Sequence, residues 1–258
     1  MIISAARLLV VSGNDPSGAG VEADRQALEG LSIGASFVVT AMTQQDATGV
    51  HEIGARGAAA WIPEARRELP VDAIKMGLLP GLEDLQAAAH LVREARARAT
   101  RTLWVVADPV IASSSGTRFL DARAAQGYVR SLAPAGVVLT PNLAELAELT
   151  SSDLESLVRN PAARVTAARI LIEAGAAGVV VKGGHGAEDP ARDLVLDAGK
   201  KEVWLAHPRI PGGKVRGSGC RFATRMAANL ALGTGLLRAA RDASEHVYGR
   251  LRMAAQGA

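Results

Sequence analysis

Residues 82–108 read LEDLQAAAHLVREARARATRTLWVVAD, a helix-forming stretch followed directly by a short apolar one. The first part, Leu82–Ala99, contains neither glycine nor proline and is rich in Ala, Leu, Glu and Arg, so it predicts a long helix. The second part, Thr102–Asp108, is an almost uninterrupted apolar run, which is typical of a strand buried on both faces. The stretch is therefore a helix followed by a buried strand, and this unit decides the fold.

The same unit recurs on both sides of this stretch. Further strands are predicted at Arg7–Ser12, Ser36–Met42, Asp72–Met76, Gly136–Leu139, Gly178–Lys182, Asp193–Leu196 and Glu202–Ala206. Further helices are predicted at Glu22–Ile33, Ala58–Leu69, Ala122–Leu132, Leu143–Thr150, Pro161–Ala174, Gly217–Leu232 and Leu236–Met253. Repeated strand–helix alternation favours right-handed crossovers and a mostly parallel central sheet with helices on both faces, so we predict an α/β fold. The last two strands are expected to form a hairpin.

Length and composition narrow the possible classes of protein. The chain has 258 residues, of which 48% are hydrophobic, enough for one large domain or two small ones. No internal repeat, low-complexity segment or long linker divides it, so we expect a single domain over residues 1–258. Aromatic residues make up only 3%, which argues against a stacking platform for single-stranded nucleic acid. The net charge of +3 comes from scattered arginines, a pattern typical of solvated helix faces, so no nucleic-acid partner is expected.

The sequence also indicates the compartment. Cys220 is the only cysteine, which excludes an intramolecular disulfide and any multi-cysteine metal site. The first residues lack a charged region followed by a long apolar region, and no run approaches 18 apolar residues. We therefore expect a cytoplasmic protein with no membrane partner.

Polar and glycine-rich segments follow several predicted strands. Gly13–Gly20 follows the first strand, Asp108 ends the strand quoted above, and Lys182–Gly186 ends a later one. Asn142 follows the strand between them, with Glu145 three residues further on. Because the carboxyl ends of parallel strands meet at one edge of a sheet, where ligands bind, we expect these segments to converge on one site.

The segment Gly217–Cys220 opens a predicted helix. Small residues let backbone N–H groups approach an anion closely, and the helix dipole favours negative charge at that end. Lys214, Arg216 and Arg221 place three cations where cations are normally disfavoured, and a bound phosphate would resolve that conflict. The pattern fits a plain helix start with outward-pointing basic side chains just as well.

Each candidate side chain at this edge has a structural alternative. Cys220 lies in the first helical turn, where the dipole and nearby cations are expected to lower the pKa of its thiol and let it take a proton. A lone cysteine is more commonly a small buried apolar residue. Asp108 and Glu145 could share a Mg²⁺ ion, or act as a capping residue and a solvated acid. Lys182 could pair with a nucleotide phosphate, or simply end a strand at the surface.

Two further polar residues follow the first two strands. Asp24 and Gln45 could contact a polar heterocycle there, or lie on the surface. Other nucleotide signatures are missing: the chain has no G-x-x-x-x-G-K-[ST] motif, and its G-x-G at Gly217 lacks the third glycine of a dinucleotide-binding fingerprint. Neither H-E-x-x-H nor G-x-S-x-G occurs.

Seven motifs occur in order along most of the chain: GNDPSGAGVEAD, TAMTQQDATGV, DAIKMGLL, ADPVIASSSG, LTPNLAEL, VVVKGGHG and GSGC. Together they resemble the hydroxymethylpyrimidine/phosphomethylpyrimidine kinases of thiamine biosynthesis, in the ribokinase-like superfamily. The resemblance implies a three-layer αβα fold. It also implies phosphorylation by ATP and Mg²⁺ of 4-amino-5-hydroxymethyl-2-methylpyrimidine, and then of its monophosphate to the diphosphate. A homodimer is expected from the family.

The resemblance also implies roles for individual residues. The helix start would form the anion hole over the transferred phosphoryl group and carry the base for the substrate hydroxyl: Gly217, Ser218, Gly219 and Cys220. Substrate-binding positions would be Gly13, Asp24 and Gln45. The magnesium and phosphate network would consist of Asp108, Glu145 and Asn142, with Lys182 near the ATP phosphates.

Some positions depart from the family pattern. The first loop reads PSGAG, one glycine shorter than the usual PSGGAG, and Arg216 and Arg221 stand where the family has His and Thr. The usual Gln-Asn pair is Gln45-Asp46, and the usual GML is Gly77-Leu78-Leu79. Two alternatives therefore stay open: a pyridoxal or pyridoxine kinase, and a catalytically impaired pyrimidine-binding homologue.

Overall fold

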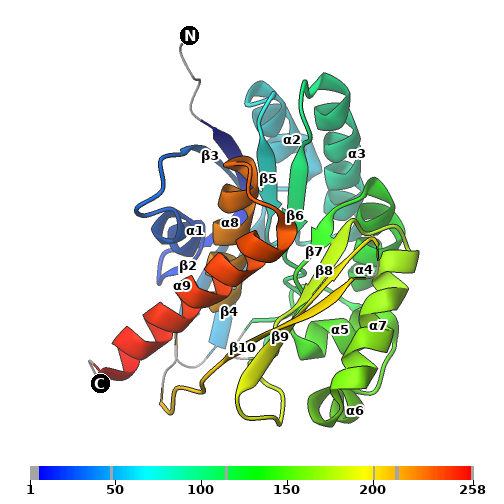
Figure 1. The fold of residues 1–258 in the computed structure, drawn as a ribbon. Coiled ribbons are helices and arrows are strands. Elements are labelled where there is room, and N and C mark those ends of the chain that lie inside the picture. The colour runs from blue at the N-terminus through cyan, green and yellow to red at the C-terminus, as the bar shows by residue number, and fades with distance from the viewer. Residues whose placement is uncertain (1–5, 47–48, 114–115, 200, 213–214, 257–258) are drawn as a thin grey trace.

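The protein is described by a computed structural model covering residues 6–46, 49–113, 116–199, 201–212 and 215–256. Its centre is a sheet with the strand order β10-β9-β8-β7-β6-β5-β1-β3-β4, and β2 pairs with β1 (Figure 1). The strands are β1 (Arg7–Asp15), β2 (Ala19–Gly20), β3 (Gly34–Asp46), β4 (Gly49–Ala55), β5 (Ala73–Met76), β6 (Trp104–Ala107), β7 (Val138–Leu139), β8 (Gly178–Val181), β9 (Ala191–Asp197) and β10 (Glu202–His207). Neighbours from β3 to β8 are parallel, which confirms the predicted α/β architecture.

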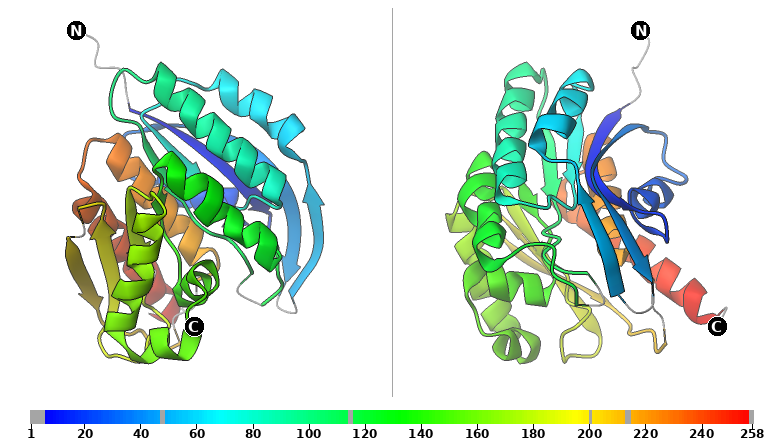
Figure 2. Two further views of the ribbon diagram at one scale, coloured as in Figure 1. Left: turned by 90° about the vertical axis from the view of Figure 1, so that its right-hand side faces the viewer. Right: turned by 180° about the vertical axis from the view of Figure 1, so that it is seen from behind.

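Helices cover both faces of the sheet (Figure 2). One face is covered by α2 (Ala58–Arg67), α3 (Leu82–Arg98), α4 (Ala122–Gly127), α5 (Leu143–Thr150), α6 (Leu154–Arg159) and α7 (Pro161–Glu173). The other face is covered by α1 (Val21–Ala27), α8 (Ser218–Ala231) and α9 (Leu236–Gln256). A π-helical turn, Tyr128–Leu132, and a 3-10 turn, Ala133–Ala135, follow α4. These are the three layers that the family resemblance implied.

Alternation along the strands explains why both faces are buried. Leu9 and Val11 pack into the core beneath α2–α7, whereas Leu8 and Val10 pack into the core beneath α8 and α9. All four side chains are at most 1% exposed. Successive strand residues point to opposite faces, so a continuous apolar run serves two cores at once.

Four local features differ from the sequence prediction. Helix α1 ends at Ala27 instead of reaching Ile33, and Gly30 turns the chain with a left-handed φ of 78°. Strand β3 runs on to Asp46 and pairs with the unpredicted antiparallel strand β4. Short helix α6 was also not predicted; the side chain of Asp153 caps it by accepting from the Ser156 N–H. The hairpin of β9 and β10 is confirmed.

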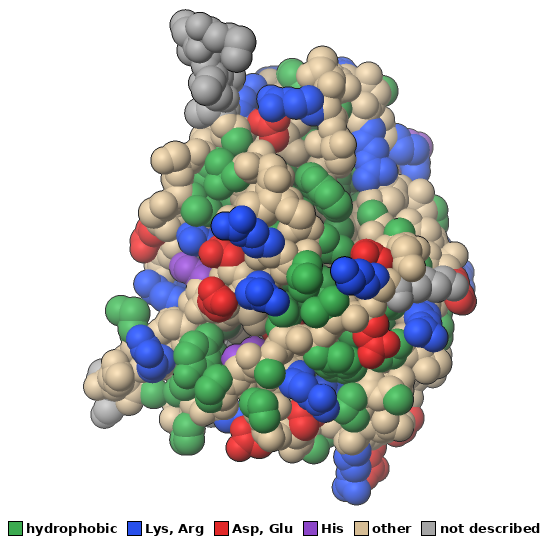
Figure 3. Space-filling view, viewed as in Figure 1, with side chains coloured by type: hydrophobic (Ala, Val, Ile, Leu, Met, Phe, Trp, Pro, Cys, Tyr) green, Lys and Arg blue, Asp and Glu red, His purple; other side chains and the backbone are tan. Residues whose placement is uncertain are grey.

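Two further features are the distribution of charge on the surface and the length of the helices. On the face seen in Figure 3, basic and acidic side chains are interspersed and form no continuous basic surface. Within the described residues, no helix combines the length and apolar character needed to cross a bilayer.

Candidate active site

The structure brings three predicted residues together at the carboxyl edge of the sheet. Asp108 follows β6, Lys182 follows β8, and Glu145 lies in the first turn of α5. Lys182 Nζ is 2.7 Å from Asp108 Oδ1 and 3.9 Å from Glu145 Oε2. Burial alone would lower the pKa of Lys182, but the two carboxylates outweigh it and raise the pKa above its ordinary value. A lysine ammonium therefore lies where two carboxylates converge.

Asn142 holds Glu145 in place through a reciprocal cap at the start of α5. The Asn142 N–H donates to Glu145 Oε2 over 2.7 Å, and the Glu145 N–H donates to Asn142 Oδ1 over 2.9 Å. Such a capping box satisfies two N–H groups that the helix leaves unpaired. Burial raises the pKa of Glu145 to about 8, with Lys182 opposing this and Asp108 adding to it. Glu145 is thus both a capping residue and part of the site.

The first turn of α8 packs against the Lys182–Asp108 pair. Gly217 precedes the helix with a left-handed φ of 69°, and a Cβ there would lie 2.8 Å from the Ala23 Cβ. A Cβ at Gly219 would lie 3.1 Å from Lys182 Nζ and 3.4 Å from Asp108 Oδ2. Ser218 lies between these two glycines, as the first residue of α8. The glycines therefore allow the helix start to approach the charged groups closely.

Cys220 lies in this same turn, but its predicted acidity is wrong. Burial raises the pKa of the thiol to about 11, although the Lys75 ammonium lowers it; the Asp24 and Asp108 carboxylates add to the rise. The expectation from sequence rested on the helix dipole and neighbouring arginines, whereas desolvation is the dominant effect in the fold. At neutral pH the side chain is a thiol.

A buried charged network that was not predicted from the sequence lies beneath Cys220. Lys75, on β5, donates to both carboxylate oxygens of Asp24, at 2.8 and 2.9 Å, and to Ser12 Oγ at 3.2 Å. Thr224 Oγ1, on α8, donates to Asp24 Oδ1 over 2.6 Å. Asp24 and Lys75 are 0% exposed. The Asp24 carboxylate is directed to Lys75 and Thr224, and the contact with a heterocycle stays a prediction.

The basic side chains next to the helix start contact groups of the protein itself. Arg216 Nη2 is 3.2 Å from Asp15 Oδ2 in the first loop. Arg221 is buried, and its guanidinium donates to the Arg216 carbonyl oxygen and to Gln26 Oε1. Lys214 lies outside the described residues. The arginines therefore tie the helix start to the first loop and to α1.

The shortened first loop is a tight turn. The Asp15 carboxylate accepts from the Ser17 N–H over 3.0 Å and from Ser17 Oγ over 2.8 Å. A Cβ at Gly20 would lie 2.1 Å from the Gly13 carbonyl oxygen, so the absence of a side chain at Gly20 lets β2 approach β1. A cavity of about 540 Å³ beside this loop is lined in part by Asp15 and Ser17. Gln45 lies in β3, and its side chain is outside the described part of the structure.

The fold and the site define a class of protein. A parallel sheet between two helical layers, with a glycine-rich helix start facing a lysine and two carboxylates, is the arrangement of a ribokinase-like small-molecule kinase. The family described as phosphomethylpyrimidine kinase matches residues 15–257, and the chain belongs to that family.

Curated relatives agree with this family. The chain is 34% identical to the hydroxymethylpyrimidine/phosphomethylpyrimidine kinase of Streptomyces coelicolor over 250 residues, covering 95% of this chain and 88% of the relative. It is 31% identical to the enzyme of the same name from Rhizobium meliloti over 255 residues, covering 98% and 92%.

Solved structures show the same fold. The pyridoxal kinase of Staphylococcus aureus in complex with ADP superimposes with a TM-score of 0.84 at 27% identity, covering 96% of this chain and 89% of that one. The same kinase in complex with pyridoxal gives a TM-score of 0.81 at 26% identity, covering 95% and 87%. These neighbours confirm the α/β fold with a mostly parallel central sheet.

Proposed function

We propose that the protein, acting as one domain over residues 1–258, transfers the γ-phosphoryl group of ATP to the hydroxymethyl oxygen of 4-amino-5-hydroxymethyl-2-methylpyrimidine. The hydroxyl oxygen forms a bond to phosphorus, the bond from phosphorus to the β–γ bridging oxygen breaks, and ADP leaves. A second transfer converts the monophosphate to the diphosphate. Family membership and the names of the relatives support this reaction.

The observation that carries the proposal is the approach of Gly219 to Lys182 and Asp108. The backbone N–H groups at the start of a helix point outward and favour an anion. Here that helix start lies so close to an ammonium group that a Cβ at Gly219 would be only 3.1 Å from Lys182 Nζ. Phosphoryl transfer depends mainly on positioning and charge neutralisation, and preorganised N–H donors with a lysine provide both. We assign Gly217, Ser218 and Gly219 to the anion hole.

Asp108 and Glu145 have the donor chemistry that Mg²⁺ requires. Their carboxylate oxygens converge on one point, which the Lys182 ammonium now occupies as a cation. Within the described residues, no group of three or more His, Cys, Asp or Glu side chains is placed to hold a metal ion. Mg²⁺ commonly uses one or two carboxylates together with substrate phosphates and water, so two carboxylates suffice. When bound, Mg²⁺ would neutralise phosphate charge; Asn142 keeps Glu145 oriented for it.

Cys220 is our proposed base for the substrate hydroxyl. It lies in the first turn of α8, beside the proposed anion hole, and close enough to Lys75 for the ammonium group to affect the pKa of its thiol. With a pKa of about 11, only about one thiol in a thousand is ionised at pH 8, but that thiolate is a strong base. The hydroxyl proton would move to Sγ as the new bond to phosphorus forms.

The remaining parts of the proposal come from the family resemblance. We assign pyrimidine binding to Gln45 and to the backbone around Gly13, and ATP phosphate contact to Lys182. We also propose a cytoplasmic homodimer that acts without a nucleic-acid or membrane partner.

A second candidate is phosphorylation of pyridoxal. The structural neighbours named pyridoxal kinase, one of them in complex with pyridoxal, favour it. Both candidate substrates carry a hydroxymethyl group on a nitrogen heterocycle, so the same anion hole would serve either.

One assay tests these candidates together. ADP release is measured with ATP, with and without Mg²⁺, over a panel of hydroxymethylpyrimidine, its monophosphate, pyridoxal and pyridoxine. The proposal predicts the highest kcat/KM for the two pyrimidines. Higher values for the pyridoxine alcohols would assign the alternative. Pyrimidine binding by calorimetry without any ADP release would identify a catalytically impaired homologue.

A further inference from the structure

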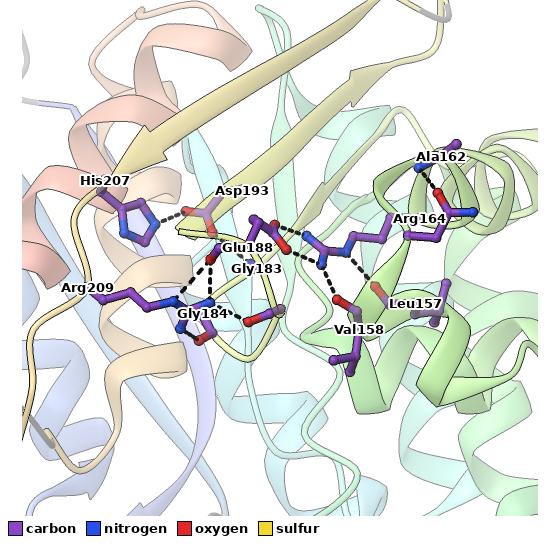
Figure 4. Close-up of polar contacts among 12 residues, drawn as sticks. Leu157, Val158, Ala162, Arg164, Gly183, Gly184, Glu188, Asp193, His207 and Arg209 are labelled. Carbon is purple, nitrogen blue, oxygen red and sulfur yellow. Dashed lines mark hydrogen bonds and ion pairs between the residues drawn. The ribbon is translucent and has the colours of Figure 1, made fainter. Parts of the chain in front are cut away.

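The loop between β8 and β9 begins immediately after Lys182. It contains Gly183, Gly184 and Gly186, so it has few side chains of its own to pack. At its start, the Gly183 N–H donates to the buried Asp193 Oδ1 over 2.8 Å. Figure 4 shows how the loop is surrounded by side chains from other elements. Its shape is therefore set by groups outside the loop together with one internal turn, in which the Gly186 N–H donates to the Gly183 carbonyl oxygen over 2.8 Å.

Arg164, on α7, holds the far end of the loop from inside the protein. Its side chain is 0% exposed and forms a two-pronged ion pair with the Glu188 carboxylate. The same guanidinium donates to the carbonyl oxygens of Leu157, at 2.6 Å, and Val158, at 2.9 Å. Glu188 is thereby fixed to the body of the protein.

Arg209 holds the same loop from outside. Its Nη1 donates to the Gly184 carbonyl oxygen over 2.9 Å, and its Nη2 donates to the Gly186 carbonyl oxygen. The Glu188 carbonyl oxygen accepts from Nε at 3.1 Å and from Nη2 at 2.8 Å. Hydrogen bonds to a charged donor are roughly twice as strong as neutral ones. An exposed arginine thus directs its donors to three carbonyls of one loop.

The position of Arg209 in the chain gives this contact a consequence for the site. Arg209 follows β10 by two residues and precedes Gly217, the start of the proposed anion hole, by eight. Arg209 lies in the segment that leads to Gly217, and it binds the loop that follows Lys182. It therefore connects the chain next to one proposed phosphate-binding element with the chain next to the other. Because Arg209 and the loop are already held together, less conformational entropy is lost when a nucleotide binds.

We propose that Arg209 is a positioning residue for the nucleotide, which acts by holding the Gly183–Glu188 loop and thereby Lys182. The inference rests on the proposed function, because Lys182 contacts the ATP phosphates only in that scheme. Arg209 itself contacts no reacting group. Since it is exposed, its replacement leaves the buried core untouched.

The test compares Arg209→Ala, Arg209→Lys and the control Arg93→Ala, which removes an exposed arginine on α3. Calorimetry measures the Kd for a nonhydrolysable ATP analogue and for the pyrimidine, and thermal unfolding is recorded for each variant. We expect Arg209→Ala to weaken analogue binding about tenfold and pyrimidine binding less than twofold, with Arg93→Ala unchanged. The lysine variant should recover part of the loss, because an ammonium can donate to the same carbonyls.

Two results would overturn the inference. One is analogue binding by Arg209→Ala within twofold of the wild type. The other is equal weakening of analogue and pyrimidine together with a lower Tm, which would assign Arg209 to general stability. A wild-type protein that binds the analogue but releases no ADP contradicts the proposed function while leaving the Arg209 comparison valid. A wild-type protein that does not bind the analogue contradicts both.

Discussion

Lys75 and Asp24 form an ion pair that is closed off from solvent beneath the start of α8. Lys75 Nζ lies 2.8 Å from one carboxylate oxygen and 2.9 Å from the other, and neither side chain has any exposed surface. Thr224, which donates to Asp24, is four residues after Cys220 and so lies on the same face of α8. The pair therefore connects β5, α1 and the helix that carries the proposed base.

Removal of one partner of this pair should destabilise the fold. Burial alone would lower the pKa of Lys75, but the neighbouring carboxylates, Asp24 first and then Asp108, help to outweigh burial, so the pKa is raised and the lysine stays charged. Lys75→Met leaves a buried carboxylate without a counter-charge, which costs about 3–5 kcal/mol. Urea denaturation measures the loss of unfolding free energy. The matched double variant, Lys75→Met with Asp24→Asn, should recover most of it, and a double variant no more stable than Lys75→Met would refute the assignment.

Gly219→Ala tests the proposed anion hole with one methyl group. Position 219 is inside a helix, where alanine is favoured, so the Tm should not fall. The new Cβ would lie 3.1 Å from Lys182 Nζ, in the space assigned to the transferred phosphoryl group. We expect kcat to fall about a hundredfold, because the methyl group keeps the N–H donor but displaces the phosphoryl group from its reactive position. ADP release near the wild-type rate would exclude this space as the reaction site.

The pH dependence of kcat/KM tests Cys220 as the base. Because burial raises the thiol pKa to about 11, the thiolate fraction grows about tenfold between pH 9 and 10, a range that lies above the pKa of about 8 of Glu145. The wild type should follow this slope. Cys220→Ala should lower kcat/KM by about two orders of magnitude, and its kcat/KM should no longer rise with pH over this range. Near wild-type turnover in that variant would remove Cys220 from the role.

His207 should make stability depend on pH. Its Nε2 is 3.5 Å from Asp193 Oδ2, and this contact raises the pKa of the half-buried imidazole above its ordinary value of 6.5. The protonated form therefore stabilises the folded chain fully below pH 6.5, and the contribution disappears as the pH rises through the raised pKa. We expect a loss of at most about 1 kcal/mol on that rise. Thermal unfolding from pH 5.5 to 8.5 should show a smaller change for His207→Gln; identical curves would contradict this.

Strong periodic patterns made most of the fold predictable. The helix predicted at Leu143–Thr150 has the same bounds in the structure, because its cap, Asn142, and its apolar face are both local signals. Strand β4 was missed because GVHEIGA has two glycines and no apolar run, and its pairing with β3 is a tertiary event. The residues of a strand do not by themselves identify the strand with which it pairs.

The site residues also fall into those that could be predicted from the sequence and those that could not. The convergence of Asp108, Glu145 and Lys182 followed from topology, since parallel strands end at one edge. Lys75 lies within the predicted strand Asp72–Met76, and a lysine between the apolar residues Ile74 and Met76 is a usable signal of a buried charge. The pKa of Cys220 could not be predicted, because it depends on desolvation by the whole fold, which no short motif encodes.

The most direct measurement of the central claim is a crystal structure with a nonhydrolysable ATP analogue and hydroxymethylpyrimidine. The account predicts that the terminal phosphoryl group lies within hydrogen-bonding distance of the backbone N–H groups of residues 217–220. Lys182 should be on its other side, and the pyrimidine hydroxyl should face Cys220. A terminal phosphoryl group bound elsewhere, or excluded from this turn by the Arg216 side chain, would contradict the account.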